Sequence, residues 1–305
     1  MRTLYMLGLL SMLGASPANA ASYTFITLDV LGATGGVTDA IGINNAGQIV
    51  GSFVDNNRTY GFLRDGSGVF RTLDPSGAFS SEAIGINAAG QIVGHFQDGT
   101  GTHGFLRDNA GVFTTLDVPS ALTTSAFGIN SAEQIVGSFS DSTGAHGFLR
   151  DSGGGVFITL DVPGATNSTL ARGINAAGQI VGGFFDSTGM HGFLRDSGGV
   201  FTTLNVPGAT GRQLATGINS AGQIVGFFQD GTGTHGFLRD NGGVFTTLDL
   251  LGAPAGINDA GQIVGDFVGG GATHGFLASP VPIPAALWFL SSALGGVSFA
   301  HRRTV

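Results

Sequence analysis

The sequence contains no cysteine and no lysine, and each absence excludes a class of protein. Without cysteine the chain has no disulfide, no thiol nucleophile and no thiolate metal ligand. All 12 basic residues are arginine, they face 20 acidic residues, and the formal net charge is −8. Nucleic acids are bound by concentrated basic surfaces, so the composition argues against a nucleic-acid partner.

Tryptophan and tyrosine are also scarce, whereas phenylalanine is abundant. The chain has 1 Trp, 3 Tyr and 24 Phe. Stacking surfaces for sugars usually present Trp or Tyr, so the sequence does not predict an aromatic carbohydrate platform. The phenylalanines recur at fixed positions and are expected in the core. The 55 glycines indicate a chain that turns often.

The first 20 residues have the pattern of a secretory signal peptide. Arg2 supplies the charged start, residues 4–13 form a short apolar run, and Ala18-Asn19-Ala20 gives small residues at the cleavage positions. We therefore expect cleavage after Ala20, with Ala18 and Ala20 as the recognised residues. The mature protein is predicted to begin at Ala21.

The last segment, residues 280–305, has the pattern of a membrane-contacting tail. Its apolar stretch of about 16–18 residues is close to the minimum that spans a bilayer. Arg302 and Arg303 follow it and are expected to stay on the cytoplasmic side, leaving the rest of the chain outside. A permanent membrane anchor is the simple interpretation.

A more specific interpretation comes from a resemblance. Pro282, Pro284, the Ala-Ala-Leu-Trp-Phe run and the terminal arginines resemble the sorting signal of PEP-CTERM proteins, which are made by Gram-negative bacteria that secrete exopolysaccharide. Ile283 stands where that family has Glu. The resemblance implies export machinery and an exosortase-like protease as partners, transient membrane contact, and final placement at the cell surface or in the extracellular matrix.

Residues 21–279 between these ends consist of one repeated unit. Gly-Ile-Asn recurs six times, at intervals of 39 to 45 residues, with its glycine at 42, 85, 128, 173, 217 and 256. In each of the five complete copies, turn residues separate four short apolar runs, which predicts a four-stranded antiparallel meander. A period of about 44 residues is typical of a propeller blade.

The sixth copy lacks its last run, and the matching run lies at the start, in residues 22–30. This offset predicts a six-bladed, all-β propeller closed by its N-terminal strand. An open β-solenoid is the alternative, but it predicts capping repeats at the ends. The first run of each copy is then innermost, where small residues are expected beside the crowded axis, namely Ala40, Ala83, Ala126, Ala171, Ala215 and Ala255.

The repeats resemble the HAF family of extracellular repeats. The signatures are Gly173-Ile174-Asn175, residues 178–182 and His191-Gly192-Phe193-Leu194, in which Gly192 replaces the alanine of the family. The resemblance covers nearly all of residues 22–277. It implies an exported protein and brings no catalytic residues with it.

The polar residues that recur in every copy are expected to be structural. A histidine opens the third run of five copies, at 103, 146, 191, 235 and 274, and Tyr60 replaces it in the first. Copies on different blades cannot share one metal ion, so we predict packed histidines beside turns, no metal site and no cofactor. Asp-x-Thr-Gly turns lack the length and the glutamate of a calcium loop, and their aspartates are expected to cap the turns.

Function is expected where the copies differ. Asp39 and Glu82 lie on adjacent first runs and are the candidate catalytic pair, because two carboxylates can hydrolyse a glycoside. Arg172, Arg212 and Gln213 are the candidate ligand-binding residues. The sequence favours an exported, non-enzymatic surface or matrix protein. The alternatives are a hydrolase or lyase acting on extracellular polysaccharide, and a ligand-binding module at the mouth of the channel.

Overall fold

The computed structural model describes residues 22–153, 155–166 and 168–281, and within them it contains β-strands and no helix. The predicted signal peptide with Ala18 and Ala20 lies outside the described residues. The sorting residues Pro282, Pro284, Arg302 and Arg303 also lie outside them. The described part is all-β, as the sequence predicts.

Each repeat forms a four-stranded antiparallel meander, because each of its apolar runs ends at a tight turn. The first is β2 (Thr38–Ile43), β3 (Ile49–Asp55), β4 (Arg58–Arg64) and β5 (Phe70–Leu73), paired in chain order. The same order recurs in β6 (Ser80–Ile86), β7 (Ile92–Gln97), β8 (Thr102–Arg107) and β9 (Phe113–Leu116), and in β10 (Thr123–Ile129), β11 (Ile135–Asp141), β12 (Gly144–Arg150) and β13 (Phe157–Leu160). It recurs again in β14 (Ser168–Ile174), β15 (Ile180–Asp186), β16 (Gly189–Arg195) and β17 (Phe201–Leu204), and in β18 (Gln213–Ile218), β19 (Ile224–Asp230), β20 (Gly233–Arg239) and β21 (Phe245–Leu248).

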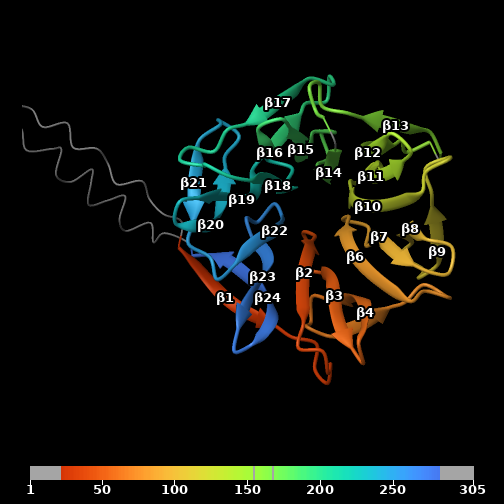
Figure 1. Cartoon of the computed structure of the whole chain (residues 1–305). Helices are drawn as coiled ribbons and strands as arrows, with labels where there is room; N and C mark the ends of the chain where they lie inside the picture. Colours follow the sequence, from red (N-terminus) through yellow and green to blue (C-terminus); the bar gives the residue numbers. More distant parts are fainter. Residues whose placement is uncertain (1–21, 154, 167, 282–305) are drawn as a thin grey trace, which may run out of the picture.

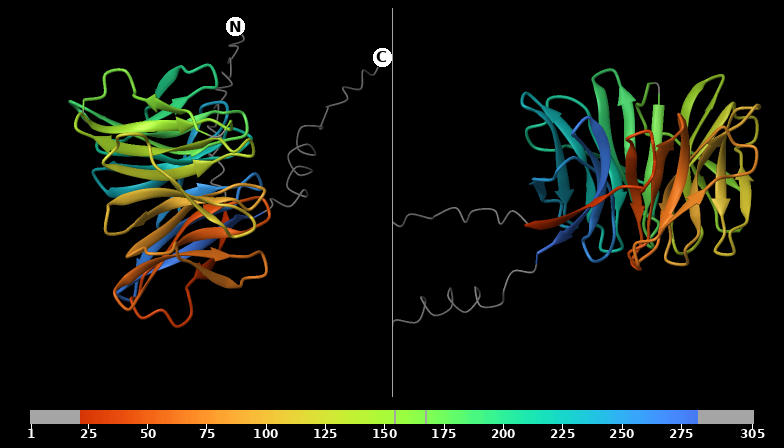
Figure 2. Two further views of the ribbon diagram at one scale, coloured as in Figure 1. Left: turned by 90° about the vertical axis from the view of Figure 1, so that its right-hand side faces the viewer. Right: turned by 90° about the horizontal axis from the view of Figure 1, so that it is seen from below.

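The meanders are arranged radially, as in a β-propeller. Figure 1 shows β2, β6, β10, β14, β18 and β22 (Ala253–Ile257) around a common centre, and Figure 2 shows the ring from its side. Three sheets have four strands each. The fourth has twelve, because single parallel residue pairs, Thr102 with Thr123 and Ala145 with Ser168, join three meanders into one sheet.

The N-terminal strand completes the last repeat. β1 (Tyr23–Leu28) pairs antiparallel with β24 (Ala272–Pro280), outside β23 (Ile263–Gly269) and β22. In Figure 1 the red strand β1 lies beside the blue strand β24. The backbone N–H of Val281 donates to the carbonyl of Ser22 at 2.8 Å, so the two ends of the described chain meet at one place. The predicted pairing of residues 22–30 with the last copy is confirmed.

The asparagine of Gly-Ile-Asn explains why this triplet recurs. In the fourth copy, Asn175 Oδ1 accepts hydrogen bonds from the backbone N–H groups of Ala177 and Gln179, which fixes the turn. Its Nδ2 donates to Gln179 Oε1 at 2.8 Å and to the carbonyl of Asn219, in the next repeat, at 3.1 Å. This buried amide therefore has a partner for each of its hydrogens and for its oxygen.

The contact between repeats continues around the whole ring. Each asparagine Nδ2 donates to the carbonyl of the corresponding asparagine in the following repeat, and Asn258 donates to Asn44 at 3.2 Å. The circuit runs through Asn44, Asn87, Asn130, Asn175, Asn219 and Asn258. These hydrogen bonds join the last repeat to the first without the involvement of β1.

The alanines of the inner strands do not line the axis, which corrects one expectation. Ala40 and its counterparts at 83, 126, 171 and 215 are fully buried, and they lie in the apolar clusters between neighbouring sheets. In the last repeat, Pro254 takes this position, because it pairs with Gly265 as Ala40 pairs with Gly51. Ala255 is instead one residue further along and faces the channel. Close packing between sheets, and not crowding at the axis, selects the small residue.

One turn departs from the repeat at Glu133, and it yields a prediction. The other five copies have glycine at this turn position. Glu133 has the same left-handed backbone conformation as those glycines, with φ of +61°. Such a conformation costs a residue with a Cβ about 1–2 kcal/mol. The only compensation visible in the described structure is one hydrogen bond, from Gln91 Nε2 to Glu133 Oε1 at 3.0 Å.

Glu133→Gly should therefore raise the free energy of unfolding by up to about 1 kcal/mol, after the entropy that glycine adds to the unfolded chain is subtracted. Thermal melts of both proteins measure the difference. Gly178→Ala is the matched control, because Gly178 has φ of +76° at the same turn position and this substitution should lower the melting temperature. A lower melting temperature for Glu133→Gly would mean that its hydrogen bond outweighs the strain.

Candidate functional site at the channel mouth

A β-bulge in each inner strand directs one side chain toward the axis of the ring. The register shifts between Ala40 and Gly42 in β2, and at the equivalent place in every repeat. The residue inside the bulge lines the channel. These residues are Ile41, Ile84, Phe127, Arg172, Thr216 and Ala255, and they differ between copies.

The channel is narrowed by a ring of isoleucines. A cavity of about 140 Å³ lies on the side where the inner strands begin, and a second, of about 110 Å³, lies on the side of the asparagine turns. Six isoleucines border both cavities: Ile43, Ile86, Ile129, Ile174, Ile218 and Ile257. A polar ligand that enters from the strand-start side therefore meets an apolar ring.

Charged residues gather on the strand-start side of the channel. Asp39 on β2 pairs across strands with Ser52, and Glu82 on β6 pairs with His95 on β7. Asp266 on β23 has the same cross-strand position as Ser52 and His95. We call Asp39, Glu82, His95, Arg172 and Asp266 the channel mouth, because electrostatic interactions connect them to one another.

Two carboxyl groups of the mouth have raised pKa values. Burial, together with the negative charges of Asp266 and Glu82, raises the pKa of Asp39 from 3.8 to about 6, against a hydrogen bond from Ser52 that lowers it. Burial also raises the pKa of Asp266. The folded protein therefore binds an extra proton at Asp39 between about pH 4 and 6, and the contribution of Asp39 to stability falls as the pH rises through that window.

Arg172 reaches into this acidic region from the fourth repeat. Its guanidinium lies over the ring of Phe127, 4.5 Å from the centroid, where cation–π attraction holds it. Burial lowers the pKa of Arg172, and the charge of Glu82 opposes that effect. The Nε of Arg172 is out of contact with solvent and has no hydrogen-bond partner among the described residues. A buried donor without a partner is costly and points to a missing ligand or water.

His95 has the second buried nitrogen without a partner. Its Nε2 is 4.0 Å from Glu82 Oε2, while its Nδ1 makes no hydrogen bond within the described structure. Burial lowers the pKa of His95, the charge of Glu82 raises it and that of Arg172 lowers it. We therefore treat the imidazole as neutral at pH 7, able to donate or to accept at Nδ1 according to its tautomer.

The structure brings three of the five predicted residues together and leaves two elsewhere. Asp39, Glu82 and Arg172 lie at the mouth. Gln213 is buried, and its Oε1 accepts a hydrogen bond from the backbone of Val206 at 2.8 Å, as the hydroxyl of Thr124 does for Val118. The Nη2 of Arg212 is 3.5 Å from the sulfur of Met190. Of the five predicted residues, Arg172 alone lines the channel cavity.

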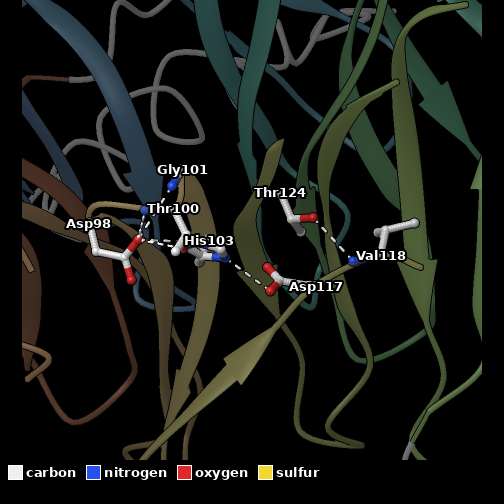
Figure 3. Close-up of polar contacts among 7 residues, drawn as sticks. All are labelled: Asp98, Thr100, Gly101, His103, Asp117, Val118 and Thr124. Atoms are coloured by element: carbon white, nitrogen blue, oxygen red, sulfur yellow. Dashed lines mark hydrogen bonds and ion pairs between the residues drawn. The ribbon is translucent and has the colours of Figure 1, made fainter. Parts of the chain in front are cut away.

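The histidines that open the third strands are structural, as predicted. Figure 3 shows His103 between its turn and Asp117. Its Nδ1 is 2.9 Å from Asp117, its Nε2 is 2.8 Å from Thr100 Oγ1, and its ring lies against Phe96. The aspartate of the turn, Asp98, accepts from the backbone and hydroxyl of Thr100, so it caps the turn.

In the first repeat, Tyr60 occupies the position of the histidine and is also held by packing and polar contacts. Tyr60 stacks on Phe53, and the guanidinium of Arg58 lies over Tyr60 and pairs with Asp74. In the repeated Arg-Asp dipeptide of the first copy, the two side chains have separate structural contacts. Asp65 caps its hairpin by accepting from Ser67 and Val69, while Arg64 lies over Phe70.

The remaining cavities offer less chemistry. A groove of about 390 Å³ lies between the fifth and sixth repeats, which are separated by the shortest interval. It is lined by His235, Asp249, Leu251 and Val268 among others. Within the described ranges, no group of three or more His, Asp or Glu residues is placed to hold a metal ion. No helix in that part of the chain is long and apolar enough to cross a membrane.

Comparison with known proteins shows the fold alone. No family model and no curated protein matches the chain. Among solved structures, TolB from Acinetobacter baumannii aligns with a TM-score of 0.60 and 13% identity over 76% of this chain, which spans 63% of the length of that TolB. A putative TolB from Agrobacterium tumefaciens aligns with a TM-score of 0.57 and 13% identity, over 87% of this chain and 99% of that TolB. A streptogramin B lyase aligns with a TM-score of 0.51 and 13% identity, over 84% of this chain and 97% of the lyase. These likenesses support a β-propeller.

Proposed function

We propose that this chain is an exported, non-enzymatic repeat protein of the cell surface or extracellular matrix that binds a ligand at its channel mouth. The architecture that we propose for it is a six-bladed propeller of four-stranded blades, closed by β1. The circuit of asparagine hydrogen bonds, which returns from Asn258 to Asn44, supports a closed ring.

One observation carries the binding role. The polar side chains that recur in the copies are engaged in turns and in contacts between neighbouring strands or repeats, as His103 and Asn175 are. The mouth collects residues that differ between copies, and two of them, Arg172 and His95, have buried nitrogens without partners. Groups that are costly to bury and that do not stabilise the fold are typical of binding sites.

The position of the two ends supports the proposal of export and sorting. Ser22 and Val281 are joined by a backbone hydrogen bond beside the outer strands of the last repeat. The predicted signal peptide and sorting tail are therefore attached at one site on the rim, away from the channel. Their removal by a signal peptidase and an exosortase-like protease would leave every inner strand in place. Extracellular polysaccharide is the surrounding material that the tail resemblance implies.

Export is tested by the intact mass of protein extracted from the surface of producing cells. We expect a mature chain that begins at Ala21 and ends near Pro284. A variant with Arg302→Ala and Arg303→Ala is the control, because it lacks the charges that mark the tail and should retain the tail. Recovery of the native chain with its tail intact in the membrane would favour a permanent anchor over sorting and release.

A second candidate function, glycoside hydrolysis, is favoured by one observation. A pKa of about 6 lets Asp39 hold a proton near neutral pH, as a general acid must, and Glu82 lies near enough to contribute to that shift. The cavity of about 140 Å³ below the mouth is bordered by the isoleucine ring, however, and is small for a sugar chain. Release of reducing ends from polysaccharide by the native protein, abolished by Asp39→Asn, would establish the enzyme.

A further inference from the structure

The net charge of the channel mouth selects the sign of its ligand. With His95 neutral and every carboxyl ionised, the mouth holds three carboxylates, of Asp39, Glu82 and Asp266, and one guanidinium, of Arg172 beside Glu82, which leaves a net charge of two negatives. These charges repel one another in a partly desolvated space. A cation placed among them would relieve that repulsion, whereas an anion would increase it.

The unpartnered nitrogens show that charge alone does not describe the ligand. Arg172 Nε carries a hydrogen that can only be donated, and no acceptor among the described residues receives it. His95 Nδ1 is also free to make one hydrogen bond. The ligand therefore needs an oxygen acceptor beside its positive charge. A bare metal ion supplies no acceptor, and the mouth has no three-ligand group for one.

The channel limits the part of the ligand that can enter. The cavity below the mouth has about 140 Å³ and is bordered by the isoleucine ring. A cavity of about 150 Å³ in another protein holds one benzene molecule. The recognised group is therefore about the size of a two- to six-atom chain, either a free small molecule or the end of a larger one.

We propose that the channel mouth binds the ammonium group of a small organic amine, with Asp39, Glu82 and Asp266 around the ammonium and the guanidinium of Arg172, which lines the cavity, donating to an oxygen of the same molecule. The inference rests on the binding role proposed above and names the class of its ligand. The amine can be free or the amino group of a sugar, since both present an ammonium beside a hydroxyl.

The pH dependence follows from the groups that face Asp39. These are Asp266 on β23, Glu82 on β6, and, beyond Glu82, His95 on β7 and Arg172 on β14. Protonation of Asp39 below about pH 6 removes one of the charges that attract the ammonium. Affinity should therefore rise several-fold between pH 5 and 6.5, a range in which alkyl amines stay protonated and Arg172 stays charged.

Titration calorimetry on the purified full chain tests the assignment with four probes at equal ionic strength. Ethanolamine carries the ammonium and the acceptor, and ethylene glycol has the same number of heavy atoms without the charge. Glucosamine tests an amino sugar, and N-acetylglucosamine is its uncharged match. We expect ethanolamine or glucosamine to bind, and their neutral matches to bind at least tenfold more weakly. The relative affinity of the two amines then shows whether the ligand is a free amine or the amino group of a sugar.

Three variants connect binding to the mouth. Asp39→Asn should weaken the bound amine at least tenfold while raising the melting temperature of the free protein at pH 7, because it removes a buried, repelled charge. Arg172→Met keeps an apolar contact with Phe127 and should weaken binding by removing the donor. Asp161→Asn removes a carboxylate beside His146, away from the channel, and should leave binding unchanged.

The outcomes separate this inference from the proposed function. Preferential binding of a neutral or anionic probe that Arg172→Met abolishes would overturn the amine and leave the binding role intact. Absence of binding by all four probes, with a melting temperature unchanged in Asp39→Asn, would overturn both the amine and the binding role. Export is tested independently by the mass of the mature protein.

Discussion

A chain that lacks residues 22–30 should lose its cooperative unfolding transition and aggregate. β1 supplies the outermost strand of the last repeat, paired with β24 from Tyr23 opposite Pro280 to Leu28 opposite Gly275. Leu28 is only 3% exposed and packs in the apolar cluster between the last and first repeats. Its removal would open that cluster and expose the edge of β24, a template for pairing with other chains. Circular dichroism during heating, with light scattering, measures both effects.

A circular permutant provides the matched control. Because Ser22 and Val281 meet through a backbone hydrogen bond, residues 22–30 can be moved to follow Val281 through a short turn, as β5 follows β4. The permutant, which begins at Leu31, contains six uninterrupted copies and should melt near the temperature of the native chain. Equal melting temperatures for the truncated and native chains would show that β1 is dispensable and that the ring does not depend on closure by this strand.

The strand pattern could be predicted from the sequence because the repeat displays it six times. A turn residue that could be accidental in one copy recurs in the others, and the offset between residues 22–30 and the last copy indicates their pairing. The sequence also shows that Asn175 is repeated. It does not show that the side chain reaches the next repeat, since a contact at a separation of 44 residues depends on how sheets pack.

The channel mouth could be predicted only in part, for a geometric reason. Asp39, Glu82 and Arg172 were recognisable as departures from the repeat on the innermost strand. Asp266 belongs to the second strand, in a position that varies among Ser52, His95 and others, but sequence alone does not reveal which face of that strand looks toward the channel. In the sequence, nothing distinguishes Phe127 from the many phenylalanines expected in the core. The bulge that directs it toward the axis is a register shift, and no residue type marks such a shift.

The same limit explains the wrong expectation about the alanines. In the last repeat, Ala255 has the right distance from its glycine to be mistaken for Ala40, but strand pairing gives that place to Pro254.

Phe193→Ala should lower the free energy of unfolding by about 3–5 kcal/mol, the usual cost of deleting a buried aromatic ring. The side chain is 0% exposed and lies in the cluster of Leu160, Ala171 and Ile180. It meets Phe201 edge to face at 5.3 Å between ring centroids.

Gly182, across the strand pair, makes room for that ring. A Cβ built on Gly182 would lie 3.0 Å from Phe193 Cε1 and 1.9 Å from the carbonyl oxygen of Leu170. The glycine backbone therefore packs closely against the ring, and removal of the ring leaves a void between the two strands.

Chemical denaturation measures the effect through the midpoint and slope of the transition. Phe79→Ala is the matched control, because Phe79 is 65% exposed and its truncation should change stability by no more than about 0.5 kcal/mol. Phenylalanines occupy the same buried position in the other repeats, at 62, 105, 148, 237 and 276. Similar losses at Phe148 and Phe193 are expected if the repeats unfold as one cooperative ring. A midpoint that does not move in Phe193→Ala would show that the sheets around Phe193 do not pack against each other as described.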